Sequence, residues 1–152
     1  MTTVTNSYRV LIKAPREAVF AYVSDLSLHP EWSGAPLSIT PLAAGPIAVG
    51  KEYLSHGDIP GQKDRPNQLR VTEYQPSTRF TFIAKDPDFG EIPHIFTFNS
   101  EAGGTLIERT VTVTLSPIKA FAYRTVIRPL VGKPSMDRAL AALKAKLETR
   151  VV

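Results

Sequence analysis

A chain of 152 residues is long enough to bury a core, and its 43% hydrophobic and 21% charged residues are not the composition of a disordered protein. The absence of cysteine excludes disulfides, thiol redox chemistry and metal sites built on thiolates. The net charge is +4, and the excess of lysine and arginine lies in residues 109–152. No apolar run reaches the ~18 residues of a membrane span, and the N-terminus lacks a signal-peptide pattern, so we expect one cytoplasmic domain over residues 1–152.

The first predicted element is a strand over Thr5–Lys13, where apolar and polar residues alternate. Ala14-Pro15 ends this strand, because proline is tolerated at the first position of a helix but not inside a strand. The apolar spacing then predicts a helix over Arg16–Asp25 and a short helical turn over Ser27–Trp32.

Six further strands are predicted from alternating patterns separated by turn residues. The turns between several of them are short, which favours antiparallel neighbours. The longer segment Gly57–Asn67 is predicted to be a loop, and loops of that length commonly border binding sites. The predicted strands are Leu37–Leu42, Lys51–His56, Gln68–Tyr74, Arg79–Lys85, Ile92–Asn99 and Thr105–Ser116.

The C-terminal part of the chain is predicted to be helical. A segment over Ile118–Val131 is expected to be interrupted by Pro129 and by Gly132–Pro134 before a final helix over Pro134–Arg150. An antiparallel sheet of seven strands with one apolar face would wrap this helix in an α+β architecture, and the space left between sheet and helix would form a pocket. The apolar stripe of the final helix comprises Met136, Ala139, Leu140, Leu143 and Leu147.

Six segments carry a recognisable pattern: Ala14–Asp25, His29–Trp32, Val49–Tyr53, Val71–Pro76 with Arg79, Gly103–Thr105 and Leu140–Glu148. Together they resemble the START/pollen-allergen (SRPBCC) superfamily, and most closely its polyketide cyclase/dehydrase branch. The resemblance covers nearly the whole chain and implies a helix-grip fold with a cavity for a hydrophobic or aromatic small molecule. Members are variously cyclases, hydrolases, lipid carriers, hormone receptors and quinone-binding proteins, so the fold alone does not fix the activity.

Arg109 lies in the last predicted strand, on the face that carries Ile107 and Val111. A guanidinium that points inward needs an acidic partner or an anionic ligand. The alternative is an arginine that reaches solvent from the strand or pairs with Glu108.

His94 shares a strand face with Phe96 and Phe98, and its usual pKa near ~6.5 would allow general acid or base catalysis. A lone histidine in such a place is more often a hydrogen-bonded wall or rim residue. Tyr53 is the third catalytic candidate. Tyr53 and His56 lie on opposite faces of their strand, so at most one of them can face the cavity.

The predicted site combines aromatic residues of neighbouring strands with the stripe of the final helix. The three histidines are far apart in the sequence and lack the spacing of a metal motif, so we predict neither a metal nor a cofactor. No nucleic-acid-binding pattern is present. The predicted ligand-binding residues are Phe80, Phe82, His94, Phe96, Phe98, Arg109, Trp32, Leu140 and Leu143, and the catalytic candidates are Arg109, His94 and Tyr53.

Three functions remain open at this point. The protein could be a cyclase or dehydratase acting on a polyketide-like precursor, with Arg109, His94 and a tyrosine polarising carbonyls or moving protons. It could instead carry a lipid, a quinone or another metabolite without chemistry. It could also dock on a membrane surface or a protein partner through the basic segment Lys119–Arg128. In each case we expect a monomer or homodimer without integral membrane association.

Overall fold

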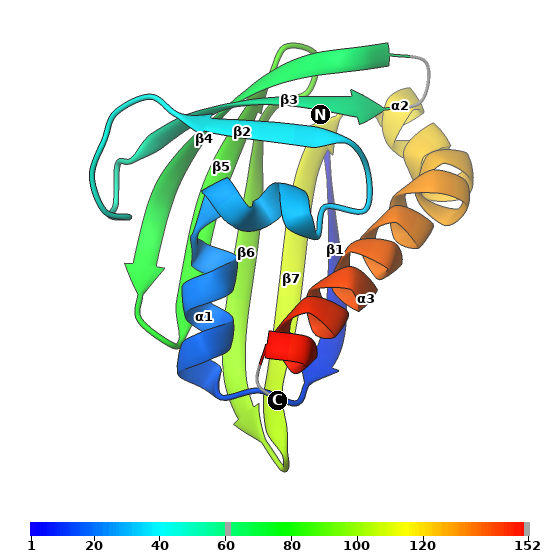
Figure 1. The fold of residues 1–152 in the computed structure, drawn as a ribbon. Coiled ribbons are helices and arrows are strands. Elements are labelled where there is room, and N and C mark those ends of the chain that lie inside the picture. The colour runs from blue at the N-terminus through cyan, green and yellow to red at the C-terminus, as the bar shows by residue number, and fades with distance from the viewer. Residues whose placement is uncertain (60–61, 151–152) are drawn as a thin grey trace.

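One antiparallel sheet of seven strands dominates the computed structural model, which describes residues 1–59 and 62–150 (Figure 1). The strand order is β1-β7-β6-β5-β4-β3-β2, so the first two strands of the chain form the two edges. The strands are β1 (Thr2–Ile12), β2 (Leu37–Pro41), β3 (Glu52–Ile59), β4 (Gln62–Gln75), β5 (Arg79–Asp86), β6 (Gly90–Glu101) and β7 (Gly104–Leu115).

The helices lie between β1 and β2 and after β7. A helix, α1 (Arg16–Ser24), begins directly after Pro15, and the 3₁₀ helix η1 (Leu26–Glu31) is capped by the Asp25 side chain, which accepts a hydrogen bond from the Ser27 amide. Figure 1 shows α1 and the final helix α3 (Lys133–Arg150) on the same side of the curved sheet. The predicted α+β helix-grip architecture is therefore confirmed.

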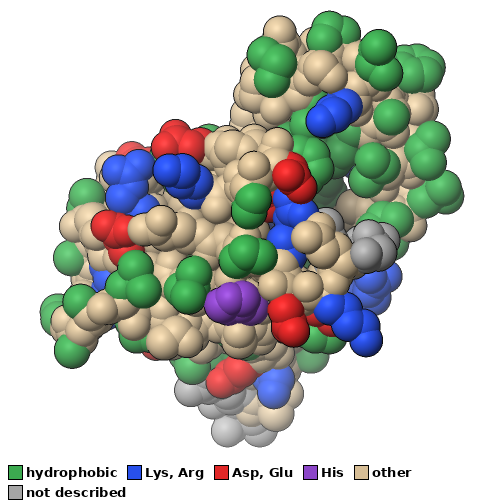
Figure 2. All heavy atoms as spheres, turned by 90° about the horizontal axis from the view of Figure 1, so that it is seen from above, with side chains coloured by type: hydrophobic (Ala, Val, Ile, Leu, Met, Phe, Trp, Pro, Cys, Tyr) green, Lys and Arg blue, Asp and Glu red, His purple; other side chains and the backbone are tan. Residues whose placement is uncertain are grey.

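The helical segment after β7 is continuous from Pro117 to Arg150. It consists of α2 (Pro117–Ala122), the π-helix η2 (Tyr123–Gly132) and α3. None of the residues of η2 is buried. Seen from above in Figure 2, apolar side chains gather on a lobe that projects from one side of the molecule, in the direction of α2 and η2 in Figure 1.

The core lies between the concave face of the sheet and helices α1 and α3. Leu140, Leu143 and Leu147 are all buried, as their spacing of three and four residues predicts. They belong to one cluster with inward-facing residues of β1, β4, β5, β6 and β7 and with the apolar face of α1. The T-shaped contact between Phe20 of α1 and Phe98 of β6, with ring centroids 5.1 Å apart, is one of the contacts that join these layers.

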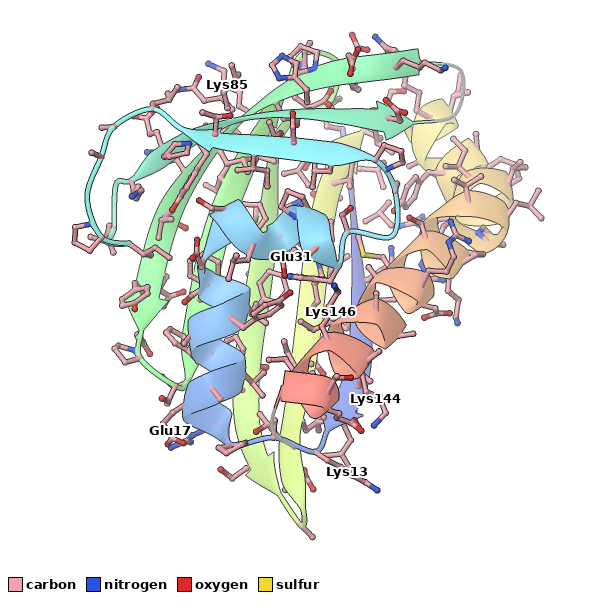
Figure 3. All side chains as sticks on the ribbon, in the orientation of Figure 1. Lys13, Glu17, Glu31, Lys85, Lys144 and Lys146 are labelled. Atoms are coloured by element: carbon pink, nitrogen blue, oxygen red, sulfur yellow. The ribbon has the colours of Figure 1, made fainter. Side chains whose placement is uncertain are left out.

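The C-terminal end of α3 is fixed against β1. Lys144 donates from Nζ to the backbone carbonyl of Leu11 (3.1 Å) and to Oε1 of Glu148 (3.0 Å). Figure 3 shows Lys144 close to Lys13, where the chain leaves β1. These contacts hold the last turns of α3 on the edge of the sheet.

The predicted loop over Gly57–Asn67 is wrong, because β3 extends into it as far as Ile59 and β4 already begins at Gln62. The two strands pair as far as Ile59 and Gln62, and residues 60–61 lie outside the described part of the chain. Pro66 is tolerated inside β4 because the pairing of β4 with β5 extends only to Gln68. Beyond that point β4 behaves as an edge strand, and an edge strand does not need every amide hydrogen.

The predicted interruption at Pro129 and Gly132–Pro134 is also wrong. Proline removes one backbone hydrogen bond from a helix, which is why it was expected to end the segment. The chain instead takes the wider turns of a π-helix over Tyr123–Gly132 and enters α3 without a break.

Candidate functional site

A cavity of about 1020 Å³ lies between the sheet, η1 and the α2–η2–α3 segment. Strands β2 to β7 form one wall, η1 contributes Leu26 and His29, and the start of α3 contributes Met136 and Ala139. Most of the lining side chains are apolar. The volume and lining are those of a site for a small organic molecule.

Arg109 of β7 lies at the buried end of this cavity and is 5% exposed. The register of β6 and β7 places Phe96 opposite Arg109, which brings His94 of β6 close to the guanidinium. Arg109 Nη2 lies 3.1 Å from His94 Nδ1. The guanidinium carbon is 5.2 Å from the ring centroid of Phe96 and 5.8 Å from that of Trp32. Glu108 faces the other way and pairs with Arg9.

Both histidines of the cavity are neutral at physiological pH. Burial lowers the pKa of His29 well below its ordinary value, and the charge of Arg109 lowers it further. Burial also lowers the pKa of His94 well below its ordinary value, and Arg109 and then His29 lower it further. Because a guanidinium can only donate, His94 Nδ1 accepts the hydrogen bond from Arg109 and the proton of the neutral ring is on Nε2.

These lowered pKa values predict a loss of stability in mild acid. As the pH falls below about 6.5, the unfolded chain takes up a proton at His29 and at His94, whereas the folded protein does not. Stability should therefore fall by at most about 1.4 kcal/mol per pH unit for each histidine. Urea denaturation between pH 7 and pH 5.5 measures this slope, and His94→Gln should reduce it. A slope of zero in the wild-type protein would contradict the buried, neutral state of both rings.

The remaining predicted site residues occupy two kinds of position. Phe82 lines the cavity together with His94, on which its ring stacks with a centroid distance of 4.6 Å. Tyr53 is 1% exposed and points into the core, and His56 lies on the opposite face of β3, so neither is part of the cavity lining. Six other predicted ligand-binding residues are buried in the core and do not line the cavity: Trp32, Phe80, Phe96, Phe98, Leu140 and Leu143.

A second polar cluster, centred on Arg65, also lines the cavity. Arg65 of β4 donates from Nε to Asp86 Oδ2 (2.8 Å) and from Nη2 to Asp86 Oδ1 (2.5 Å). Nη2 also donates to Asp88 (2.7 Å), and the guanidinium lies over the ring of Phe89. Burial alone would raise the pKa of Asp86, but hydrogen bonds from Arg65, from two backbone amides and from Asn67 outweigh burial and hold this pKa far below its ordinary value.

Sequence reasoning missed the Arg65 cluster and the position of His29. The sequence predicts a loop at Arg65 and ends the predicted strand over Arg79–Lys85 just before Asp86, so it gives no reason to expect the two side chains to pair. The spacing of His29 from the other histidines argues against a metal site but does not place the ring in a cavity. The alternation of Arg65, Asn67 and Leu69 on one face of β4 is the signal that could have placed Arg65 in the cavity wall.

Residues 1–59 and 62–150 contain no group of three or more histidine, aspartate or glutamate side chains arranged to hold a metal ion. In the same part of the chain, no helix combines the length and the apolar character needed to cross a membrane.

Residues 1–148 match the family model described as polyketide cyclase/dehydrase and lipid transport. The chain belongs to this family. The resemblance to the START/pollen-allergen superfamily and its polyketide cyclase/dehydrase branch, predicted from the residue pattern, is thus confirmed. No curated protein sequence gives a significant match to this member of the polyketide cyclase/dehydrase and lipid transport family.

Solved structures similar to this family member share its fold at low sequence identity. Protein CV1439 from Chromobacterium violaceum is 16% identical, with a TM-score of 0.69 over 95% of this chain and 96% of the other. Ara h 8.0201 is 13% identical, with a TM-score of 0.70 over 97% and 99%. The di-domain ARO/CYC StfQ from the steffimycin biosynthetic pathway is 12% identical, with a TM-score of 0.76 over 98% of this chain and 52% of StfQ. At these identities the similarity concerns the fold.

Proposed function

We propose that the protein binds an apolar small molecule in the cavity between the sheet and the C-terminal helical segment. The observation that carries this proposal is the cavity of about 1020 Å³ with its largely apolar lining. Apolar lining in contact with water costs free energy, and an apolar ligand removes that contact. The family description, which includes lipid transport, supports the same function.

We favour binding without chemistry over a cyclase or dehydratase reaction. Cyclisation and dehydration need groups that take up and release protons near the working pH. The pKa values of His29 and His94 are lowered well below the ordinary value, which makes both rings weak bases. Burial, and then the charge of Asp25, raises the pKa of Tyr53 to about 12, and Tyr53 does not line the cavity. A carrier of a lipid, a quinone or another apolar metabolite fits these properties better.

Nile red, a neutral apolar dye, tests the cavity as the binding site. Ala84 of β5 lines the cavity and is 5% exposed, so the indole of Ala84→Trp would occupy space that a ligand needs. We expect this variant to bind the dye at least about tenfold more weakly than the wild type. Ala145→Trp, on the exposed face of α3, is the matched control and should bind as the wild type does. Equal binding by both variants would mean that the dye sits elsewhere.

Two measurements separate a carrier from an enzyme. Native mass spectrometry of the purified protein, followed by extraction, identifies apolar molecules that co-purify. Incubation with a linear poly-β-ketone thioester should give the same products as incubation in buffer alone if the protein is a carrier. A ring product formed by wild type and lost in Ala84→Trp would establish the cyclase alternative instead.

A second candidate function, docking on a membrane surface, is favoured by the segment α2–η2. Ile118, Phe121 and Leu130 are 84%, 69% and 72% exposed, which is unusual for large apolar side chains. The stretch from residue 117 to residue 136 contains four lysines and arginines and no acidic residue. A protein surface with apolar side chains among cations suits an anionic lipid membrane, which offers both an apolar interior and the opposite charge. A homodimer formed through the same α2–η2 surface would instead bring like charges together.

Vesicle co-sedimentation tests this second function. We expect binding to vesicles of phosphatidylcholine with phosphatidylserine and little binding to phosphatidylcholine alone. Leu130→Glu should abolish the binding. Leu42→Glu is the matched control, because Leu42 is also exposed, at 56%, but lies at the end of β2, on a different part of the surface. Equal loss in both variants, or no binding by the wild type, would argue against docking through α2–η2.

A further inference from the structure

The buried end of the cavity holds a charge without a counter-ion. Within residues 1–59 and 62–150, no carboxylate forms an ion pair with Arg109, and the hydrogen-bond partner of its guanidinium is the neutral ring of His94. Two buried nitrogens of the cavity lining, Arg109 Nε and His29 Nδ1, have no hydrogen-bond partner in the same part of the chain. The same holds for Nε1 of Trp32, which lies in the core beside the Arg109 guanidinium. Buried polar atoms of this kind are uncommon in folded proteins and need an explanation.

Arg65 lines the same cavity and provides a comparison, because it is a buried arginine whose charge is neutralised by carboxylates. Its Nε and Nη2 hold the two oxygens of Asp86, and Asp88 and Gln62 accept further hydrogen bonds. Arg109 is equally buried, at 5%, but among the described residues its Nε has no hydrogen-bond partner and its Nη2 contacts only the imidazole of His94. Arg65 therefore has two carboxylate partners, whereas Arg109 has none in the described part of the chain.

The surroundings keep Arg109 positively charged in spite of this. Burial lowers its pKa to about 10, which still leaves the guanidinium protonated at neutral pH. The faces of Phe96 and Trp32 lie within 6 Å of the guanidinium carbon and offset part of the cost of burying the charge. Aromatic faces are weaker partners than an anion, so the site retains a preference for negative charge.

We propose that the buried end of the cavity binds the carboxylate of an apolar carboxylic acid, with Arg109 as its counter-ion. This proposal rests on the proposed function, because it assigns a head group to the ligand of the same cavity. The carboxylate accepts hydrogen bonds from the guanidinium, and the neutral His94 ring, held by Arg109 at Nδ1, keeps the guanidinium in one orientation. The hydrocarbon part of the ligand lies along Phe82, Val111 and Met136 toward the open end. Lys119 also lines the cavity, but it is exposed and its charge is solvated.

The test compares dodecanoate with dodecan-1-ol, which has the same chain length and no charge. At pH 7.5 the wild type should bind dodecanoate at least about tenfold more tightly than the alcohol, as measured by calorimetry. Arg109→Met, which keeps an unbranched side chain, should weaken dodecanoate binding about 10- to 100-fold and change alcohol binding by less than about threefold. Arg138→Met, at an exposed position on α3, is the control and should match the wild type.

A second measurement uses dodecanoate labelled with ¹³C at the carboxyl carbon. In the wild-type complex the carboxylate should remain ionised at pH values where free dodecanoic acid is protonated, and this difference should disappear in Arg109→Met. The stability of ligand-free Arg109→Met should equal or exceed that of the wild type, because the substitution removes an uncompensated buried charge.

Equal affinity of the wild type for acid and alcohol would overturn the carboxylate assignment and leave the cavity function intact. An equal loss of affinity for the acid and the alcohol in Arg109→Met would also overturn the carboxylate assignment and leave the cavity function intact. Binding of neither ligand, nor of Nile red, would overturn the cavity function and the assignment together. The comparison of the two ligands in the wild type needs no variant, so it decides the question even if Arg109→Met does not fold.

Discussion

Replacing Asp86 by asparagine is expected to lower the free energy of unfolding by roughly 3–5 kcal/mol. The Asp86 and Arg65 side chains are 6% and 5% exposed, and they share two hydrogen bonds. The amide cannot neutralise the guanidinium, so the variant leaves a buried cation with only the exposed Asp88 to pair with. Urea denaturation followed by circular dichroism measures the change.

Glu73→Gln is the matched control for this prediction. Glu73 also pairs with an arginine, Arg79, but their side chains are 35% and 39% exposed. A pair of this kind contributes about 0–1 kcal/mol. The Asp86–Arg65 pair also depends on pH, because the pKa of the Asp86 carboxyl is lowered in the folded protein. The stability that this pair contributes is therefore present above about pH 4 and is lost as the pH falls further. If both variants lost the same small amount, the Arg65 cluster would not be a stabilising pair.

Gly104→Ala should be about as damaging, with a loss of roughly 3–5 kcal/mol. A Cβ at Gly104 would lie 2.1 Å from the carbonyl oxygen of Ile12 and 2.9 Å from its carbonyl carbon. Both are backbone atoms of β1, so the collision cannot be relieved by rotating a side chain. The start of β7 would have to move away from β1, where Thr105 donates a buried hydrogen bond to the carbonyl of Ala14 (2.8 Å).

The neighbouring glycine provides the control for this second prediction. Gly103 has φ +82°, and a Cβ there would meet no atom within 4 Å. Gly103→Ala therefore carries the cost of the left-handed backbone alone, about 1–2 kcal/mol. Denaturation curves of the two variants should differ clearly. Equal losses would show that the close approach of β7 to Ile12 is relaxed in solution.

Most of the fold could be predicted because its signals are local. Alternation over residues 5–13 and 105–116 and the leucine spacing of α3 each identify an element and its buried face. The wrong predictions concern segments that contain proline or glycine, because these residues can end an element in one context and lie inside it in another. Pro66 lies in a strand because β4 has no β5 partner at that point, and Pro129 lies in a helix that widens its turns. Both explanations depend on neighbours that the sequence does not reveal.

The site was harder to predict than the fold. The inward direction of Arg109 follows from strand alternation, because it shares a face with Ile107 and Val111. Whether an inward-facing residue lines a cavity or fills the core depends on the distance between the sheet and the covering helices at that residue. His94 and Phe96 share one face of β6, yet His94 lines the cavity and Phe96 does not. No periodicity separates two such positions.

The sheet order also determines how the chain can fold during synthesis. The hydroxyl groups of Thr3 and Thr114, 111 residues apart, lie 3.5 Å from each other where β1 pairs with β7. A ribosome therefore releases β1 long before its partner exists, and the buried face of β1 has nothing to pack on in the meantime. Closing so long a loop costs conformational entropy before any contact repays it, so we expect folding in milliseconds to seconds rather than microseconds. A nascent chain that ends before β7 keeps an unpaired edge strand with an apolar face, which makes aggregation its main hazard.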